Sequence, residues 1–131
     1  MTKEFNNLEE IKKYYIKEIN TYVFKENDEY IDVVIFNFDL DIKANIDALD
    51  VKARNINVLD IDSTDIKAYS IIANNIYAHD INTWDITAKD ISYFSVCFAR
   101  GNIKCKSIKS NYPNAKHFVL NGELEVEEEE N

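Results

Sequence analysis

Residues 45–96 read NIDAL DVKAR NINVL DIDST DIKAY SIIAN NIYAH DINTW DITAK DISYF SV when they are written in groups of five. Every group places Ile or Val at its second position, from Ile46 to Val96 without exception. A mostly small residue, most often Ala, follows two positions later, and Asp, Asn or Ser stands directly before the Ile or Val. The unit is therefore Asp/Asn-Ile-x-Ala-x, and its period of five fits neither an α-helix nor a flat strand.

The spacing within the unit predicts a β-solenoid. The Ile and Ala of one unit are two positions apart, so both point to the same side of an extended segment. The next inward position is missing, so the chain must turn once per unit. We predict four such corners per coil, which gives a quadrilateral coil of about 20 residues stacked on the next at about 4.8 Å. Asp, Asn and Ser stabilise turns through their short side chains, and here they stand in for Gly and Pro, of which the chain has 2 and 1.

The repeats resemble those of the pentapeptide-repeat proteins over about residues 42–110. This resemblance implies a right-handed quadrilateral β-helix. The order of residues departs from the family pattern, because that pattern usually places the small residue two before the large one, whereas here Ala follows Ile. The segment from Ser92 to Val126, with its Cys105-Lys-Ser-Ile-Lys and His117-Phe-Val-Leu elements, resembles proteins of phages and mobile elements.

The flanking segments are predicted to cap the solenoid. Residues 1–41 form an N-terminal cap, with an amphipathic α-helix over residues 5–24 and a strand over residues 30–42, because apolar residues recur there at helical and then alternating spacing. Residues 42–110 form the solenoid. Residues 111–126 form a C-terminal cap hairpin around Asn121-Gly122, a pair that favours a type I′ turn. The acidic residues 127–131 are expected to be a disordered tail.

The same pattern assigns side chains to the inside or the outside. All eleven Ile and Val positions are predicted to point inward in columns about 20 residues apart. Cys105 falls in an inward small position, and Cys97 falls in an outward position. Tyr93 and Phe98 enlarge the small position near the end of the repeat, and the register slips by two residues at Gly101-Asn102.

Composition narrows the classes of function. The net charge of −9 disfavours nucleic acid as a direct ligand and permits a basic protein partner. The charge is uneven, since residues 39–90 carry ten acids and five bases, whereas the segment from Ile91 to Gly122 has no acid. No apolar run approaches the roughly 20 residues of a membrane span. The start, Met1 to Asn7, is polar and charged, so we expect no signal peptide and a cytoplasmic location.

Four aspartates of the repeat are candidate partner-binding residues: Asp60, Asp80, Asp85 and Asp90. One hypothesis is that a rod of carboxylates imitates DNA, as proposed for quinolone-resistance members of the pentapeptide-repeat family. The alternative is corner chemistry, because the position holds six Asp, three Asn and two Ser, and no Glu occurs from Tyr30 to Gly122. Selection for charge alone would admit Glu, so we favour the corner interpretation, with mimicry as a secondary role.

Outward apolar residues are the second candidate surface, with Tyr69 and Trp84 as its partner-binding residues. For Tyr69 the alternative is that the N-terminal helix covers it. Catalytic signals are poor, because His79 and His117 have no Cys or Ser near them in a recognisable motif. The two cysteines lack the spacing of a zinc site or a disulfide framework. We therefore expect no enzyme activity, no metal and no cofactor.

Together these features predict a mainly β protein that acts by binding. The leading hypothesis is a non-enzymatic acidic protein that binds and inhibits a nucleic-acid-binding protein, as a DNA-mimic, anti-CRISPR-like phage anti-defence inhibitor would. It would contact neither nucleic acid nor membrane directly. The alternative is a structural or self-associating scaffold module, with a homodimer formed through the caps.

Overall fold

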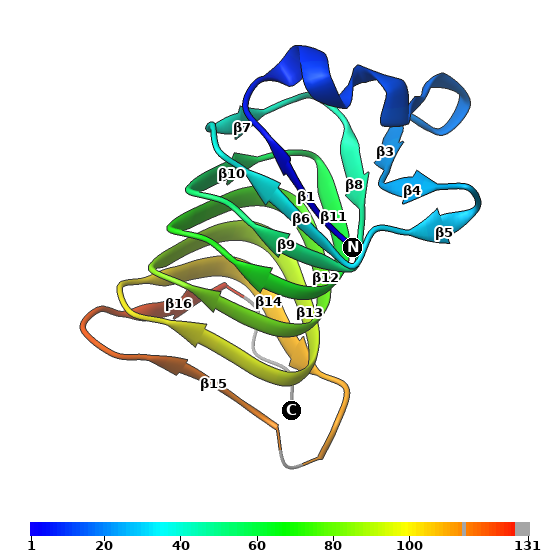
Figure 1. Ribbon diagram of the computed structural model, residues 1–131. Helices are drawn as coiled ribbons and strands as arrows, with labels where there is room; N and C mark the ends of the chain where they lie inside the picture. The colour runs from blue at the N-terminus through cyan, green and yellow to red at the C-terminus, as the bar shows by residue number, and fades with distance from the viewer. Residues whose placement is uncertain (114, 128–131) are drawn as a thin grey trace.

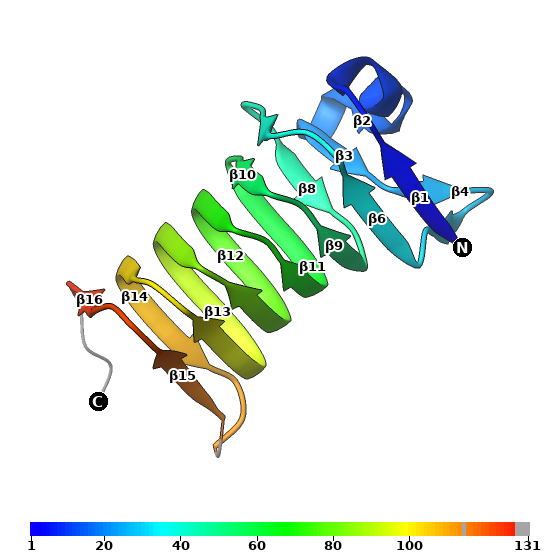
Figure 2. The ribbon, with the colours of Figure 1, turned by 60° about the vertical axis from the view of Figure 1, so that its left-hand side comes forward.

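The computed structural model describes residues 1–113 and 115–127, which form a mainly β solenoid of about five coils (Figure 1). The coils lie one behind another along a single axis, as the side view in Figure 2 shows. Neighbouring coils pair as parallel strands. The predicted β-solenoid is therefore confirmed.

The coil register differs from the prediction. Ile61 pairs with Ile46 on one neighbouring coil and with Ile76 on the other, so equivalent residues are three five-residue units apart. Ile66 and Ile71 sit in two further columns with the same spacing. The predicted four-unit coil of about 20 residues is wrong. The reason is that the period of five fixes the unit, whereas the number of units per coil depends on the backbone angle at each corner. The right-handed winding stays a prediction.

Each coil therefore has three faces, which we call A, B and C after their inward columns. Face A has Ile46, Ile61, Ile76, Ile91 and Ile108; face B has Val34, Val51, Ile66, Ile81 and Cys97; face C has Leu40, Ile56, Ile71, Ile86 and Ile103. The strands at the start of the solenoid are short: β6 (Val33–Phe36), β7 (Leu40–Asp41), β8 (Asn45–Asp47), β9 (Asp50–Lys52) and β10 (Asn55–Asn57). The later strands run round the corners: β11 (Asp60–Lys67), β12 (Ser70–Thr83), β13 (Asp85–Ala99) and β14 (Ile103–Ser110).

Ten of the eleven predicted inward positions, Ile46 through Ile91, are buried to 1 % exposure or less. The exception is Val96, which is 40 % exposed. Strand β13 carries one extra residue here, because Ala78 pairs with Tyr93 while Asp80 pairs with Val96. Because of this extra residue, the side chains that follow it point to the opposite side of the strand from the one that the repeat predicts.

The predicted inward and outward directions of the side chains after Tyr93 are therefore partly wrong. Cys97 is fully buried instead of outward, and Phe98 points outward while Ala99 is buried. Tyr93 and Cys105 are buried as predicted. The two-residue slip is real, since Ile86 pairs with Ile103, but half of it arises after Tyr93 and half near Gly101.

The predicted α-helix over residues 5–24 is wrong. The segment forms β1 (Thr2–Phe5), the 3₁₀ helix η1 (Leu8–Tyr14), β2 (Tyr15–Ile16), the 3₁₀ turn η2 (Lys17–Ile19) and β3 (Thr21–Val23). Asn7 caps η1 by accepting a hydrogen bond from the Glu10 N–H at 3.1 Å. Asn20 adopts a left-handed conformation with φ 50°, which ends helical structure. The β-branched and aromatic residues of β2 and β3 then favour strand.

The predicted strand over residues 30–42 is divided. Its residues fall in β5 (Glu29–Tyr30), which pairs with β4 (Lys25–Glu26), and in β6 and β7. The N-terminal segment nevertheless caps the core, because η1 lies across the first coil at the top of Figure 1. Four buried rings pack together beneath it: Phe5, Tyr14, Phe24 and Phe36.

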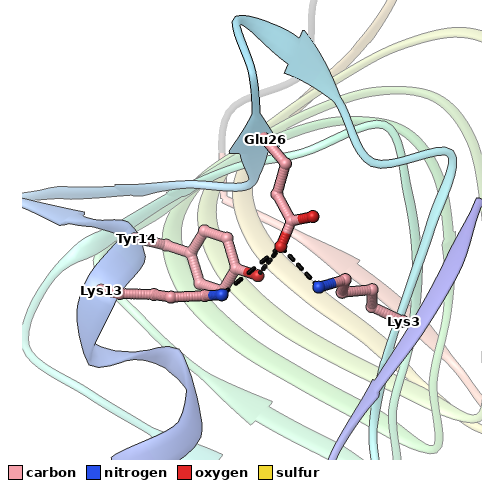
Figure 3. Close-up of polar contacts among 4 residues, drawn as sticks. All are labelled: Lys3, Lys13, Tyr14 and Glu26. Atoms are coloured by element: carbon pink, nitrogen blue, oxygen red, sulfur yellow. Dashed lines mark hydrogen bonds and ion pairs between the residues drawn. The ribbon is translucent and has the colours of Figure 1, made fainter.

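A single carboxylate ties this cap together (Figure 3). Glu26 Oε1 accepts hydrogen bonds from Lys3 Nζ at 2.5 Å and from Tyr14 Oη at 2.7 Å, and Lys13 Nζ lies 3.5 Å away. The hydrogen bonds from Lys3 and Tyr14 lower the pKa of Glu26 to about 2. The cluster links β1, η1 and β4, and so fixes the cap over the aromatic core.

The predicted C-terminal hairpin is also wrong. Strand β15 (Lys116–Val119) pairs in parallel with β13, and β16 (Leu124–Val126) pairs in parallel with β14. Residues 116–126 therefore form a further part of the solenoid. Asn121-Gly122 makes a corner against the preceding coil, where a Cβ on Gly122 would lie 2.2 Å from Gly101 O. The predicted tail is wrong for Glu127, whose N–H donates to Cys105 O at 3.1 Å, and its residues 128–131 lie outside the described residues.

We expect Ile71→Asp to abolish cooperative folding, with a loss of more than about 4 kcal/mol, because it buries an unpaired carboxylate in the middle of face C. Ile72→Asp is the matched control, since Ile72 points outward and is 48 % exposed. Thermal unfolding followed by circular dichroism would compare the two. Equal melting temperatures for both variants would contradict the inward and outward assignment.

Candidate interaction surfaces

Side chains at the corner before face A bind the next coil. Asn45 Oδ1 accepts a hydrogen bond from the Asp60 N–H, and Asp60 Oδ1 accepts one from the Asn75 N–H, both at 3.1 Å. Asp90 continues this column by accepting from Ser107 Oγ at 2.6 Å. Each oxygen therefore satisfies a polar group of the following coil.

The corner before face C repeats this arrangement. Asp85 Oδ1 accepts from the Asn102 N–H, and Asn102 Oδ1 accepts from the Glu123 N–H, both at 2.8 Å. Asp and Asn make the same contact in both corners, because only an oxygen at this reach is needed. These contacts support the corner interpretation of the Asp/Asn position.

The corner before face B has a different chemistry. Asp50, Asp65 and Asp80 follow one another in register, one on each coil. Burial raises the pKa of Asp65, and the neighbouring charges of Asp50 and Asp80 raise it further. We call these three residues the aspartate column. Like charges stacked at this spacing cost stability, so turn formation alone does not account for them.

Face A carries further acids on its outer surface. Asp47 and Asp62 are paired neighbours, and burial together with the charge of Asp47 raises the pKa of Asp62. Tyr30 Oη donates to Asp47 Oδ2 at 2.8 Å. A shallow groove of about 500 Å³ runs over Asp47, Asp60 and Asp62. We call Asp47, Asp60, Asp62 and Asp90 the acidic face.

These carboxylates are not neutralised by ion pairs. Within residues 1–113 and 115–127, the ion pairs join Met1 to Asp32, Lys3 and Lys13 to Glu26, and Lys12 to Glu9. None of them includes an aspartate of the repeat. The acidic face and the aspartate column therefore present their charge to solvent.

The structure divides the predicted aspartates among three corners. Asp60 and Asp90 lie before face A, Asp80 lies before face B, and Asp85 lies before face C. Sequence reasoning missed Asp47, Asp62 and the clustering of Asp50 with Asp65. The 15-residue spacing between Asp47 and Asp62 would have revealed the first pair, had three units per coil been assumed.

The predicted aromatic residues form a stack at the other edge of face B. Tyr69 and Trp84 are 58 % and 46 % exposed, and their ring centroids are 6.1 Å apart at an interplanar angle of 18°. Arg100 Cζ lies 5.6 Å from the centre of the Trp84 ring, on the next coil. Arg54 precedes Tyr69 in the same column, since the Tyr69 N–H donates to Arg54 O. We call Arg54, Tyr69, Trp84 and Arg100 the aromatic ridge.

The ridge is open to a partner. The N-terminal segment packs over the first coil and leaves Tyr69 exposed, so the alternative that it covers Tyr69 is wrong. The ring faces of Tyr69 and Trp84 are turned toward each other, and Arg100 lies over Trp84. The ridge therefore offers ring edges, the Tyr hydroxyl, the indole N–H and guanidinium groups, which are the groups found at protein–protein contacts.

The buried groups near the end of the solenoid are poorly suited to nucleophilic chemistry. Burial raises the pKa of Cys97 to about 12 and that of Cys105 to about 11. Tyr93 Oη lies 2.9 Å from His117 Nδ1, and burial lowers the pKa of that histidine. Among the described residues, no group of three or more His, Cys, Asp or Glu side chains is placed to hold a metal ion.

Comparisons of the chain with models of protein families, with curated proteins and with solved structures found no match. The resemblance to pentapeptide-repeat proteins therefore stands on the repeat residues alone, and the three-unit coil departs from the four-sided coil that it implied. In the part of the chain that the structure describes, no helix has the length and apolar character needed to cross a membrane.

We expect Asp65→Asn to raise thermal stability at neutral pH, because it removes the repulsion from Asp50 and Asp80. The raised pKa of Asp65 means that the folded state binds its proton more tightly than the unfolded state does. Wild-type stability should therefore include a gain as pH falls through the folded pKa toward the unfolded value of about 3.9, and Asp65→Asn should lose that gain.

Asp65→Glu is the matched variant that keeps the charge. We expect it to lose about 1 kcal/mol, because the longer side chain fits the corner poorly. Chemical denaturation at several pH values would measure both variants. Equal stability of wild type and Asp65→Glu would favour selection for charge over corner geometry.

Proposed function

We propose that the protein is a non-enzymatic interaction protein that binds and inhibits a nucleic-acid-binding protein, with its aspartates taking the place of nucleic acid phosphates. The observation that carries the proposal is the set of stacked aspartates without ion pairs on face A and at its edge, in which Asp62 and Asp65 have raised pKa values. A protein that needed these positions for turns alone would gain stability by using Asn. The chain instead keeps Asp here despite the repulsion between neighbouring carboxylates, and a binding role would account for that choice.

The density of charge is close to that of DNA. Seven aspartates belong to the acidic face and the aspartate column, between residues 47 and 90. At 15 residues per coil they span about three coils, or roughly 14 Å, at the usual distance between strands. One charge per roughly 2 Å compares with one per about 1.7 Å along duplex DNA.

The scaffold holds these charges in place. Asp60 and Asp62 lie on β11, which is paired on both sides, with β8 and with β12. A partner therefore meets carboxylates whose backbone is already ordered, and binding costs less conformational entropy than it would for an acidic disordered segment. A right-handed winding belongs to the same proposal, since parallel strands joined by crossovers in one sheet are almost always right-handed.

The proposal also includes the biological setting. The resemblance of Ser92–Val126 to phage and mobile-element proteins supports an anti-defence role, such as anti-CRISPR-like inhibition of a host nuclease in the cytoplasm. The net charge of −9 argues against direct binding of nucleic acid. Self-association is the second candidate function, and the exposed aromatic ridge favours it.

We expect the triple change of Asp47, Asp60 and Asp62 to Asn to preserve the fold, since Asn keeps the acceptor oxygens that Tyr30 and the Asn75 N–H use. Binding to a basic nucleic-acid-binding protein recovered with the tagged chain should fall at least tenfold, and the difference should shrink as salt is raised. Added duplex DNA should compete with the wild type.

The matched control changes Asp39, Asp41 and Asp85 to Asn, which removes the same charge from face C and its corner; Asp85, a partner-binding candidate from the sequence, is not among the seven aspartates of this proposal. Its affinity should stay near that of the wild type. If the Asp47, Asp60 and Asp62 variant is folded and binds at full strength, the mimicry proposal fails. Equal losses in both variants would indicate a general effect of net charge.

A further inference from the structure

The outer surface of face B has three parallel columns. The aspartate column forms one edge and the aromatic ridge forms the other. Between them lies a central column that is apolar at its two ends and basic at Lys52 and Lys67: Ile35, Lys52, Lys67, Asn82, Phe98 and Phe118. A groove of about 370 Å³ separates the central column from the ridge, and its floor is Ala53, Ala68 and Thr83.

The later coils of face B expose a contiguous apolar surface. Phe98 and Phe118 are paired neighbours, and Phe118 is 49 % exposed. Val96 flanks them on the edge that carries the aspartate column, and Leu120 flanks them on the edge that carries Trp84. These two side chains are 40 % and 60 % exposed. The extra residue after Tyr93 is what turns Val96 and Phe98 outward. A patch of this kind on a small protein is typical of an interaction surface.

We propose that face B is a homodimer interface, in which two copies of this chain meet face to face about a two-fold axis parallel to the solenoid axis. Such an axis keeps each coil at its own level and reverses the order of the columns. The aspartate column of one copy then lies opposite the aromatic ridge of the other. A two-fold axis perpendicular to the solenoid axis in the interface plane would instead place aspartate on aspartate, so charge selects the parallel arrangement.

Donors and acceptors match at three successive levels. Asp50 lies on the same coil as Arg54, Asp65 on the same coil as Tyr69, and Asp80 on the same coil as Trp84. In the dimer the three carboxylates face a guanidinium, a phenol O–H and an indole N–H of the second copy, and each pair occurs twice. The match extends over several coils because both copies share one spacing of about 4.8 Å.

The central column is also compatible with this arrangement. Phe98 and Phe118 meet their own equivalents near the axis and remove the apolar surface from water. Lys52 and Lys67 also approach their equivalents, but each lies between its own aspartate column and that of the second copy. This accounts for an aspartate column whose charges repel within one chain.

The size of the face suits a reversible dimer. Face B is about 16 Å wide and, with six paired strands from β6 to β15, about 29 Å long, so two copies cover roughly 1,000 Å², at the lower limit for specific interfaces. We therefore expect a dissociation constant in the micromolar range. The acidic face, Asp47, Asp60, Asp62 and Asp90, stays outside the dimer, whereas the aspartate column, which supplies three of the seven charges counted for the proposed function, lies inside it. The dimer contact therefore lies on face B and not on the caps.

Sedimentation velocity of the full chain over a range of concentrations tests the dimer. The wild type should pass from monomer to dimer, whereas Phe118→Asp should remain monomeric to at least tenfold higher concentration. Ile72→Asp is the matched control, because it adds the same charge at a 48 % exposed position on face C. It should dimerise like the wild type, as should the Asp47, Asp60 and Asp62 variant of the acidic face.

A charge exchange tests the orientation and does not depend on Phe118. Arg54→Glu alone and Asp50→Arg alone should each weaken the dimer, because each homodimer then opposes like charges twice. A mixture of the two variants should restore it, since the mixed dimer has one native pair and one reversed pair. A wild type that stays monomeric at every concentration, a dimer that resists Phe118→Asp, or a mixture that fails to restore association would each overturn the inference.

Discussion

The structure depends on one buried aliphatic side chain in every five residues, paired in parallel with its equivalent 15 residues away. The columns through Ile61, Ile66 and Ile71 are almost completely excluded from water. The small residue two positions later, such as Ala78, leaves room for three such columns around one axis. Because each coil contacts only its neighbours, stability grows coil by coil, and the two ends need separate solutions. At the N-terminal end the solution is the aromatic cluster under η1.

Corner chemistry follows from the same constraint. The chain must turn after each small residue without glycine, and an oxygen one residue before the next Ile fulfils that need. Asp60 and Asn102 show the pattern, since each accepts a backbone N–H from the following coil. Asp and Asn are equivalent for this contact, so wherever Asp is kept next to other Asp, a further reason for the charge must exist. Asp65 between Asp50 and Asp80 is the clearest case.

The inward side chains and the corner residues could be predicted from the sequence, because both repeat with the unit itself. The number of units per coil could not, since side-chain periodicity does not report the corner angle. The error carried into the site, because a 20-residue coil separates Asp47 from Asp62 and places Trp84 apart from Tyr69. The extra residue after Tyr93 was also hidden: Val96 keeps the sequence period although Cys97 takes its place in the core. Near the N-terminus, helical spacing of apolar residues competed with the strand preference of Tyr15, Ile16 and Thr21-Tyr22-Val23, and pairing with β8 decided the outcome.

A three-unit coil also explains how one small chain carries separate surfaces. Any outward position recurs every 15 residues on the same face. Substitutions at the outward positions of one column can therefore change the chemistry of one face without altering the buried columns. Acids have accumulated on face A, whereas face B carries Lys52 and Lys67 beside the aromatic ridge. The aspartate column lies at the corner that these faces share. A partner on face A and a second copy on face B would both approach this corner, and its repulsive charge is lowered by basic groups from either side. Both contacts would therefore use the same three carboxylates, Asp50, Asp65 and Asp80.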